Sequence, residues 1–337
     1  MTVVATGRST DLDPRLLEHR TELRGYCYRM LGSAHDAEDA VQETMIRAWK
    51  GLDRFEGRSS LRSWLYRIAT NVCLTMLEGR GRRALPMDLE AGPFPPVAES
   101  LGSPVAAGTW VEPAADSAVL PAVADPADLV VERESIRLAF VVALQHLPPR
   151  QRAVLILREV LRWSAEEVAD LLDTTTASVN SALQRARASM ARKPVPQQRT
   201  EPSREEHKEL LARYVEAFER YDIEALVKLL HEDATQDMPP YRLWIRGRAD
   251  IATWMLGPGA ACRDSRVLPV QVNGTVGFVQ WKRAKDGDGY DAWALHVLEV
   301  VGDKVASVTS FLETDLFAQF GVPLHLDADQ EIEVAAG

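Results

Sequence analysis

Apolar residues recur at helical spacing over most of the first 190 residues of the chain. In the first 83 residues this pattern predicts three helices, over residues 14–31 and 34–49 and from residue 61 onward. Pro14 suits the first turn of a helix, and Gly32-Ser33 separates the first two helices. The apolar stripes are Leu16, Leu23, Cys27 and Met30, then Ala37, Val41, Met45 and Ala48, then Leu61, Trp64, Leu65, Ile68 and Val72.

A second group of helices is predicted after residue 128. Ile136, Phe140, Ala143 and Leu147 give one helix, and Pro148-Pro149 ends it and starts the next. The stretch that follows, residues 163–190, reads WSAEEVADLLDTTTASVNSALQRARASM.

This stretch predicts a helix-turn-helix. Ser164 followed by Glu167 forms a capping box for a short helix, and polar residues 173–175 interrupt the apolar pattern. A second helix follows, and its solvent side carries no acid. Such a helix lies in the major groove of DNA in helix-turn-helix proteins, while the alternative is an ordinary helical hairpin with a solvated basic face. The apolar side of the second helix comprises Val179, Leu183, Ala186 and Met190.

The pattern changes in the last third of the chain. Helical spacing over residues 203–218, after the Asp222 cap, and over 247–256 gives way to alternation with a period of two. Asn273-Gly274 is a strong hairpin signal. Helices followed by an antiparallel sheet predict an α+β domain. The strands are expected near residues 267–272, 276–281, 290–301 and 305–312.

Two linkers divide the chain into domains over residues 11–83, 128–191 and 203–325. Residues 84–127 are acidic and rich in proline, which predicts an extended and mostly irregular connector. Trp110 and Val111 within it are either a local anchor or a chance apolar pair. Residues 192–202 form a second, shorter linker.

Composition narrows the classes of function. The 337-residue chain carries a net charge of −10, so any contact with nucleic acid must come from local basic patches. Its three cysteines are isolated, which predicts neither a disulfide framework nor a zinc site and fits a reducing cytoplasm. No apolar run approaches the roughly 20 residues of a membrane span, and no signal peptide is evident.

Two charged surfaces carry candidate chemistry in the first domain. The solvent side of the helix at 34–49 is either an ordinary solvated face or an acidic docking surface for a basic partner. Basic residues between 54 and 83, with Trp64, Tyr66 and Asn71 among them, suit strand-separated DNA. Trp64 also falls on the apolar stripe, which favours a place in the core. The acidic surface comprises Asp36, Glu38, Asp39, Gln42 and Glu43.

Four blocks of sequence resemble the extracytoplasmic-function (ECF) sigma factors, the small two-domain sigma subunits of bacterial RNA polymerase. The blocks are DAEDAVQETMIRAW, FEGRSSLRSWLYRIATNVCL, LPPRQRAVLILREV and the helix-turn-helix, in that order. The resemblance implies that the acidic surface docks on the polymerase clamp and that the second domain contacts the polymerase flap. It also implies a linker that runs through the polymerase near its active cleft.

The same resemblance implies which residues contact promoter DNA. Asn71 is the best candidate for pairing with an extruded base. The family pattern departs at Asp173, Asn180 and Ala182, where a glycine and two basic residues are usual, so the preferred −35 sequence should be atypical. The −10 residues are Phe55, Arg58, Ser59, Ser60, Arg62, Arg67 and Asn71. The −35 residues are Thr176, Ser178, Asn180, Ser181, Gln184, Arg185 and Arg187.

The third domain resembles the SnoaL-like cone-shaped barrel of the ketosteroid-isomerase relatives, through its layout, ERYDIEALVKLLHEDATQDMPP and GRADI. A carboxylate beside aromatic residues and a histidine can hold a general base, but no triad or metal spacing is present, which favours a non-catalytic pocket for a small ligand. We therefore expect no enzymatic activity, cofactor or metal. The candidate pocket comprises Asp237, Tyr241, Trp244, Trp254, Trp281 and His296.

The sequence thus predicts a sigma factor with a barrel that modulates it in the same chain. Its partners would be core RNA polymerase, promoter DNA and a possible small ligand, with no membrane. The alternative is a helix-turn-helix regulator that works without polymerase, fused to a ligand-binding or isomerase-like barrel.

Overall fold

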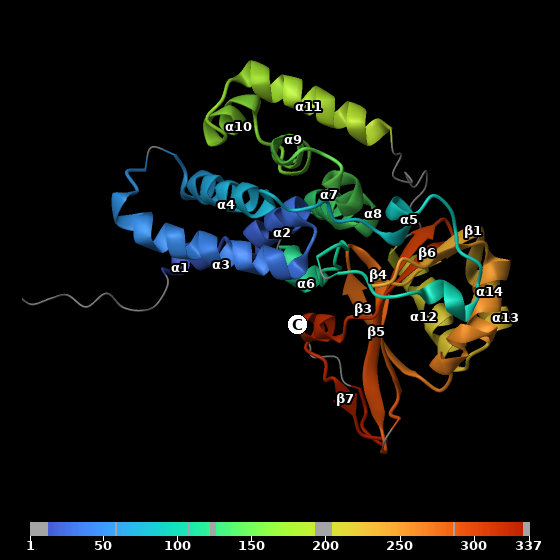
Figure 1. Ribbon diagram of the computed structural model, residues 1–337. Coiled ribbons are helices and arrows are strands. Elements are labelled where there is room, and N and C mark those ends of the chain that lie inside the picture. The colour runs from blue at the N-terminus through green and yellow to red at the C-terminus, as the bar shows by residue number, and fades with distance from the viewer. Residues whose placement is uncertain are drawn as a thin grey trace, which may run out of the picture.

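The structure, a computed structural model, describes residues 13–57, 59–106, 108–121, 126–192, 204–285 and 287–332. Helices make up the first half, and a mixed sheet with its own helices makes up the second (Figure 1). This order confirms the predicted fold class of two all-α parts followed by an α+β barrel. The shorter linker falls almost entirely outside the described residues.

The first helical part begins with two helices where one was predicted. α1 (Pro14–Leu17) and α2 (Arg20–Leu31) are separated by a turn at Glu18 and His19, so the prediction of one helix over residues 14–31 was wrong. The His19 ring, at the start of α2, lies 2.6 Å from a carboxylate oxygen of Glu22. Side chains of Ser33 and Ser60 cap the next two long helices. These elements are α3 (Ala34–Gly51), η1 (Leu52–Arg54) and α4 (Leu61–Leu77).

The longer linker lacks long helices, as predicted, but it packs on the rest of the chain throughout much of its length. Trp110 and Val111 are buried, and Trp110 pairs with Ala84, so this pair is a true anchor. The linker backbone also bonds to the barrel, since the Phe94 amide donates to the Trp244 carbonyl at 2.8 Å. The short elements of the linker are α5 (Pro86–Leu89), η2 (Ala98–Leu101) and α6 (Asp116–Val119).

The second helical part contains the predicted helix-turn-helix. Ser164 and Glu167 form the capping box, and Asp173 has a φ of 50°, the left-handed conformation expected in the turn. The helix predicted over residues 136–147 is divided, because Arg137 takes an extended conformation and starts a new helix. The elements are α7 (Pro126–Ile136), α8 (Leu138–Gln145), α9 (Pro149–Leu155), the π-helical turn η3 (Ile156–Val160), α10 (Ala165–Leu171) and α11 (Thr176–Ala191).

The barrel contains the four predicted strands and three that were not predicted. β1 (Leu230–Asp237) pairs in parallel with β6 (Lys304–Phe311), so the sheet is mixed and the purely antiparallel prediction was wrong. β1 was missed because its sequence, LHEDATQD, is too polar to show alternation. The strand order is β2-β1-β6-β5-β4-β3, with β7 beside β5. The other elements are α12 (Arg204–Glu219), α13 (Ile223–Leu229), β2 (Trp244–Arg246), α14 (Arg248–Leu256), η4 (Pro258–Cys262), β3 (Arg266–Val272), β4 (Thr275–Arg283), β5 (Tyr290–Val301), η5 (Thr314–Phe320) and β7 (His325–Leu326).

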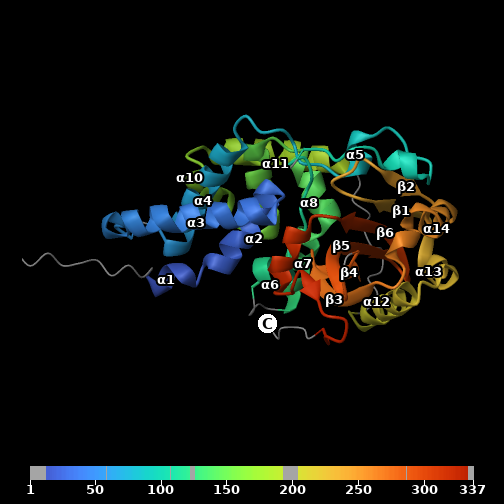
Figure 2. The same ribbon diagram turned by 60° about the horizontal axis from the view of Figure 1, so that its bottom comes forward.

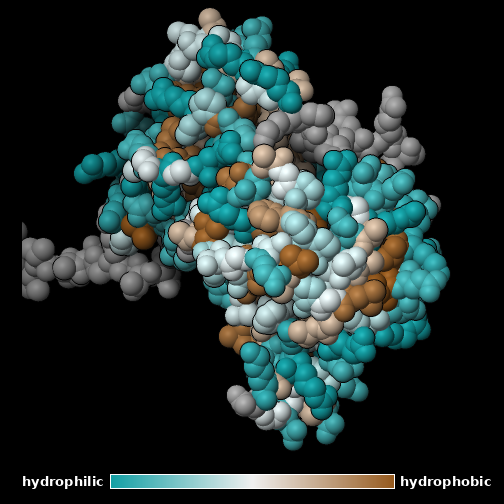
Figure 3. All heavy atoms as spheres, turned by 45° about the vertical axis from the view of Figure 1, so that its right-hand side comes forward, coloured by the Kyte–Doolittle hydropathy of each residue, from teal (hydrophilic) through white to brown (hydrophobic). Residues whose placement is uncertain are grey.

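The sheet has a different core on each face. On one face, Phe278 and Leu298 pack with α12, α13 and α14, and we call this the helix-covered core. These three helices lie on the side of the sheet that faces away from the helical half (Figures 1 and 2). Val279 and Trp281 belong to the other core, which continues into the two helical parts. The barrel and the helical half therefore share one apolar interior, while hydrophilic residues cover much of the face seen in Figure 3.

Candidate functional site

Helix α11 presents the expected −35 residues to solvent. On the opposite side of the helix, Val179, Leu183 and Ala186 are buried against the rest of the domain, and this fixes which side of α11 is exposed. Arg187 is paired with Glu159 at 2.5 Å, and Arg185 donates to the Ser181 hydroxyl at 2.6 Å. All seven expected residues are exposed: Thr176, Ser178, Asn180, Ser181, Gln184, Arg185 and Arg187. Such amides, hydroxyls and guanidinium groups can bond to base edges and phosphates.

The acidic surface of α3 divides into two sets. Asp39 and Gln42 are exposed, and Glu43 is half-buried beside Arg47 at 2.6 Å. Ile46, one turn beyond Gln42, is 45% exposed. The sequence reading missed Ile46, because a single apolar residue on a polar face carries no periodic signal.

The other two acidic residues are held by arginines of the same chain. Asp36 lies 2.8 Å from both Arg80 and Arg83, and its side chain is 13% exposed. Glu38 is paired with two arginines of α2, Arg20 and Arg24. The structure therefore brings Asp39, Gln42 and Glu43 together on the surface, and turns Asp36 and Glu38 toward internal partners.

The expected −10 residues lie in the loop before α4 and along that helix. Phe55 packs against Trp64 with ring centroids 5.0 Å apart, so Trp64 is a half-buried contact rather than a free stacking surface. Ser60 caps α4 by accepting from the Ser63 amide at 3.0 Å. Ser59 and Asn71 are exposed. Arg58 lies outside the described residues.

Two of the expected −10 arginines, Arg62 and Arg67, contact the second helical part, although Arg67 stays exposed and Arg62 is half-buried. Arg67 donates to the backbone carbonyl of Asp170, in α10, at 2.7 Å. Arg62 is bonded to Glu22 at 2.8 Å, and its guanidinium lies 5.1 Å from the Tyr66 ring centroid and 5.5 Å from that of Trp163.

Aromatic packing completes this contact between the two helical parts. The rings of Tyr66 and Trp163 are 5.1 Å apart, and Trp163 is 5% exposed. We call this contact between α4 and the start of the helix-turn-helix the seam. Sequence reasoning missed it because Arg67 and Asp170 are 103 residues apart in the chain.

His296 lies in the core of the barrel within a chain of hydrogen bonds. Its Nε2 is 2.7 Å from Gln280, its Nδ1 is 2.9 Å from Ser310, and Phe278 stacks on the ring at 4.4 Å. Burial lowers the pKa of His296 to about 3, so the ring is neutral at physiological pH. Both ring nitrogens are occupied by these partners.

Asp237 lies on the other face of the sheet. Thr309 donates to one of its carboxylate oxygens at 3.1 Å, and the other has no partner among the described residues. Thr309 and Ser310 are neighbours in β6 and so point to opposite faces, which separates Asp237 from His296. Burial raises the pKa of Asp237 to about 8; the Thr309 hydrogen bond opposes this rise and the nearby carboxylate of Asp88 adds to it.

The expected pocket is therefore not assembled as one site. Trp254 packs in the helix-covered core with His296, and Tyr241 is half-buried against it. Trp244 is half-buried in β2. Trp281 faces the other core, edge-on to Phe317 at 5.2 Å. Successive side chains of a strand point to opposite faces of the sheet, which explains the division. Because the sequence did not reveal β1, the face that Asp237 occupies could not be predicted.

Among the described residues, no group of three or more histidine, cysteine, aspartate or glutamate side chains is arranged to hold a metal ion. No helix in the same part of the chain is long and apolar enough to cross a membrane.

A helical part with an acidic helix, a second helical part with a helix-turn-helix and a SnoaL-like barrel follow one another in this chain, and together they match sigma factors of the sigma-70 class. Sigma-70 region 2 matches residues 16–83, Sigma-70 region 4 matches 137–190, and the SnoaL-like domain matches 211–308. The chain belongs to the ECF RNA polymerase sigma factors. It is thus a subunit that binds core RNA polymerase and directs it to promoters.

Individual relatives agree with this assignment. The chain is 46% identical over 323 residues to the ECF RNA polymerase sigma factor SigG of Mycobacterium tuberculosis, covering 95% of this chain and 86% of that protein. It is 32% identical over 161 residues to the sigma-E factor of Escherichia coli K12, covering 48% and 75%. The crystal structure of M. tuberculosis SigJ has the same fold, with a TM-score of 0.59, 24% identity and coverage of 92% and 98%.

Proposed function

We propose that this sigma factor adopts a closed state in which its own contacts keep the −10 helix from promoter DNA, and that the barrel maintains this state. The seam is the observation that carries the proposal. Arg67 donates to the carbonyl of Asp170, and Arg62 lies over Trp163. These contacts hold both guanidinium groups against the second helical part and use donors that would otherwise be available to phosphates of the −10 strand.

The geometry of a promoter supports an opening step. By their names the −10 and −35 elements are centred about 25 base pairs apart, or about 85 Å at roughly 3.4 Å per base pair. In the seam, α4 and α10 touch. One molecule in this state cannot hold both elements, so α4 and the helix-turn-helix must separate before the promoter is engaged.

We assign the surfaces as follows. Asp39, Gln42 and Ile46 on α3 dock core polymerase, and α11 reads the −35 element through Asn180, Ser181, Gln184 and Arg185. Phe55, Ser59, Ser60 and Asn71, with Arg62 and Arg67 after opening, hold the −10 strand. Bacterial RNA polymerase works in the cytoplasm, so we also propose that location.

The barrel acts in this proposal as a regulatory domain without catalysis. Asp237 and His296 are on opposite faces of the sheet, so they cannot act as an acid–base pair. A small apolar ligand that enters the core beside Phe278 would find the polar chain of His296, Gln280 and Ser265 within it. Such a ligand is a suitable signal for opening.

Run-off transcription tests the proposal. Core polymerase is combined with the full chain or with a chain that ends near Gln197, on the same promoter fragments. We expect several-fold more transcript from the shorter chain, because it lacks every contact of the barrel with the helical half. An Asp39→Ala variant of each chain checks that the output depends on docking to polymerase. Equal output from both chains under all conditions would rule out regulation by the barrel.

A further inference from the structure

The Asn273-Gly274 turn between β3 and β4 is a hairpin tip buried inside the molecule. Both residues have positive φ, 53° and 68°, as the turn requires. Hairpin tips normally lie at the surface, but Asn273 is fully buried. This tip points away from the barrel's own core and toward the junction of the two helical parts and the linker.

The side chain of Asn273 bonds to three separate parts of the chain. Its amide nitrogen donates to the Tyr28 hydroxyl of α2 and to the Ile136 carbonyl of α7, each at 2.6 Å. Its carbonyl oxygen accepts from the linker amide of Ala114 at 3.0 Å. The backbone amide of Asn273 also donates to the Ala114 carbonyl at 3.0 Å. Each of these bonds crosses from the barrel to another part.

Gly274 extends the contact and leaves no room for a side chain. Its amide donates to the Asp116 carboxylate of α6 at 2.8 Å. A Cβ at this position would overlap the backbone carbonyl of Arg133 in α7. Only glycine fits both the turn and the approach to α7.

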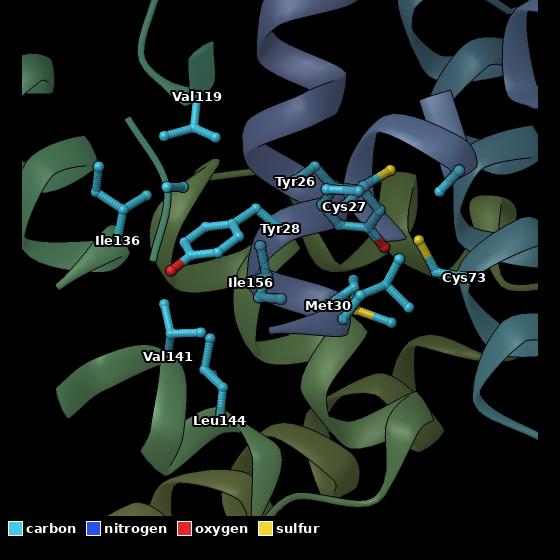
Figure 4. Close-up of a cluster of buried hydrophobic side chains, with 14 of the residues drawn as sticks. Tyr26, Cys27, Tyr28, Met30, Cys73, Val119, Ile136, Val141, Leu144 and Ile156 are labelled. Carbon is cyan, nitrogen blue, oxygen red and sulfur yellow. The ribbon is translucent and has the colours of Figure 1, made fainter. Parts of the chain in front are cut away.

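Tyr28 carries the contact further into the first helical part. Its hydroxyl accepts from Asn273 and donates to the Glu112 carbonyl at 2.9 Å. Figure 4 shows its ring among Val119, Ile136 and Val141, pointing away from Cys73. The turn therefore reaches the centre of the interface, where α2, α7 and the linker meet.

We propose that the Asn273-Gly274 turn is a latch that holds the first helical part, the second helical part and the linker together, and that withdrawal of this turn opens the chain. The latch rests on the closed state proposed above, and it adds which contact the barrel uses. β3 and β4 also carry residues of the helix-covered core, Val267 and Phe278. A change in that core thus has a direct structural route to the tip.

The experiment compares Asn273→Ala with Asp303→Ala in the full chain. Asp303 is exposed in the turn between β5 and β6 and is a matched control. We expect Asn273→Ala to shift the equilibrium toward the open form by roughly 5- to 150-fold, because buried partners lose their hydrogen bonds. Small-angle scattering measures the radius of gyration, which is about 20 Å for a compact chain of this length. Hydrogen exchange should accelerate in α6 and α7 and stay unchanged in β4 and β5.

A second variant protects the test against misfolding. Tyr28→Phe keeps Asn273 and removes the hydroxyl that accepts its bond, so it should give a smaller change of the same kind. If β4 and β5 lose protection from hydrogen exchange in Asn273→Ala, the barrel of that variant is not correctly folded, and the result with Tyr28→Phe is used to test the latch. The latch is overturned if the folded variant, or Tyr28→Phe in its place, stays as compact and as protected as Asp303→Ala.

Transcription by the same variants separates the latch from the proposed function. Expansion with more run-off transcript supports both. Expansion without any change in transcript supports the latch and overturns regulation by closure. No expansion by the variants, together with a more active chain ending near Gln197, overturns the latch and leaves regulation by the barrel standing.

Discussion

The two helices expected to contact promoter DNA, α4 and α11, differ in how available they are. Every expected −35 residue on α11 is exposed, and Arg185 and Arg187 are bonded only within their own helical part, whereas Arg62 and Arg67 on α4 contact the other helical part across the seam. In the proposed closed state, α11 would therefore be available to a −35 element, and α4 would present Arg62 and Arg67 to the −10 strand only after the seam opens. A chain of this kind can have intact recognition chemistry and still be silent, because availability and chemistry are controlled separately.

The largest expected effect comes from breaking the seam. Trp163→Ala should lower the free energy of unfolding by about 3–5 kcal/mol, since the ring is buried against Tyr66. Urea denaturation measures this loss. Trp293→Ala, at a tryptophan that is 38% exposed on β5, should cost about 1 kcal/mol or less. Similar losses in the two variants would mean that the seam contributes little.

A second pair of variants tests the difference between the helices directly. Gln184→Ala should weaken binding of the free chain to a −35 duplex by about 1–3 kcal/mol, if its amide reads a base. Asn71→Ala should leave that affinity unchanged and reduce open-complex formation with polymerase. Fluorescence anisotropy at constant salt measures the first effect, and permanganate footprinting measures the second. Equal weakening of duplex binding by both variants would contradict the assigned division of roles.

Ionisation of Asp237 should weaken the packing of the barrel against the linker, because Asp237 is buried near the carboxylate of Asp88. Its folded pKa of about 8 is above the ordinary 3.8, so the folded state holds the proton more tightly than the unfolded state does. Stability is therefore lost as pH rises from about 4 to 8 and levels off above that. Asp237→Asn should be more stable than the parent at pH 8, by about 1–3 kcal/mol, and should lose this dependence. Parallel stability–pH curves for the two proteins would refute this assignment.

The smallest effect on stability is expected on the docking surface of α3. Asp39→Ala should change the free energy of unfolding by no more than about 0.5 kcal/mol, because Asp39 is exposed. Its affinity for core polymerase should nevertheless fall, while Asp53→Ala, beyond the end of α3, serves as a control. Competition against another sigma factor for core polymerase measures the affinity. Undiminished affinity would remove Asp39 from the docking surface.

Much of the fold was predictable, because local signals and burial agree in the long helices. The stripe of Val179, Leu183 and Ala186 fixes which side of α11 is exposed, so the exposed side of this helix followed from spacing alone. The Ser164–Glu167 capping box and the Asn273-Gly274 turn are likewise local signals that the structure contains.

Features that depend on contacts distant in sequence were not predictable. The engagement of Arg67 by Asp170 leaves no local signal, nor does the burial of a hairpin tip inside a junction of domains. In the barrel, a polar strand concealed which way Asp237 faces, so six residues were grouped that the sheet in fact divides. These features depend on the topology of the fold, and the periodicity of a single segment carries no information about topology.

The buried tip also imposes an order on synthesis. The ribosome completes both DNA-contacting halves, through residue 191, before it reaches residue 274, which lies 83 positions later. At about 5–20 residues per second, this interval is on the order of 4–17 s. Under the proposed latch, a nascent chain has its promoter-contacting parts during this interval and still lacks the turn that holds them together, so each new molecule would begin without the latch and close fully only when its final third has folded.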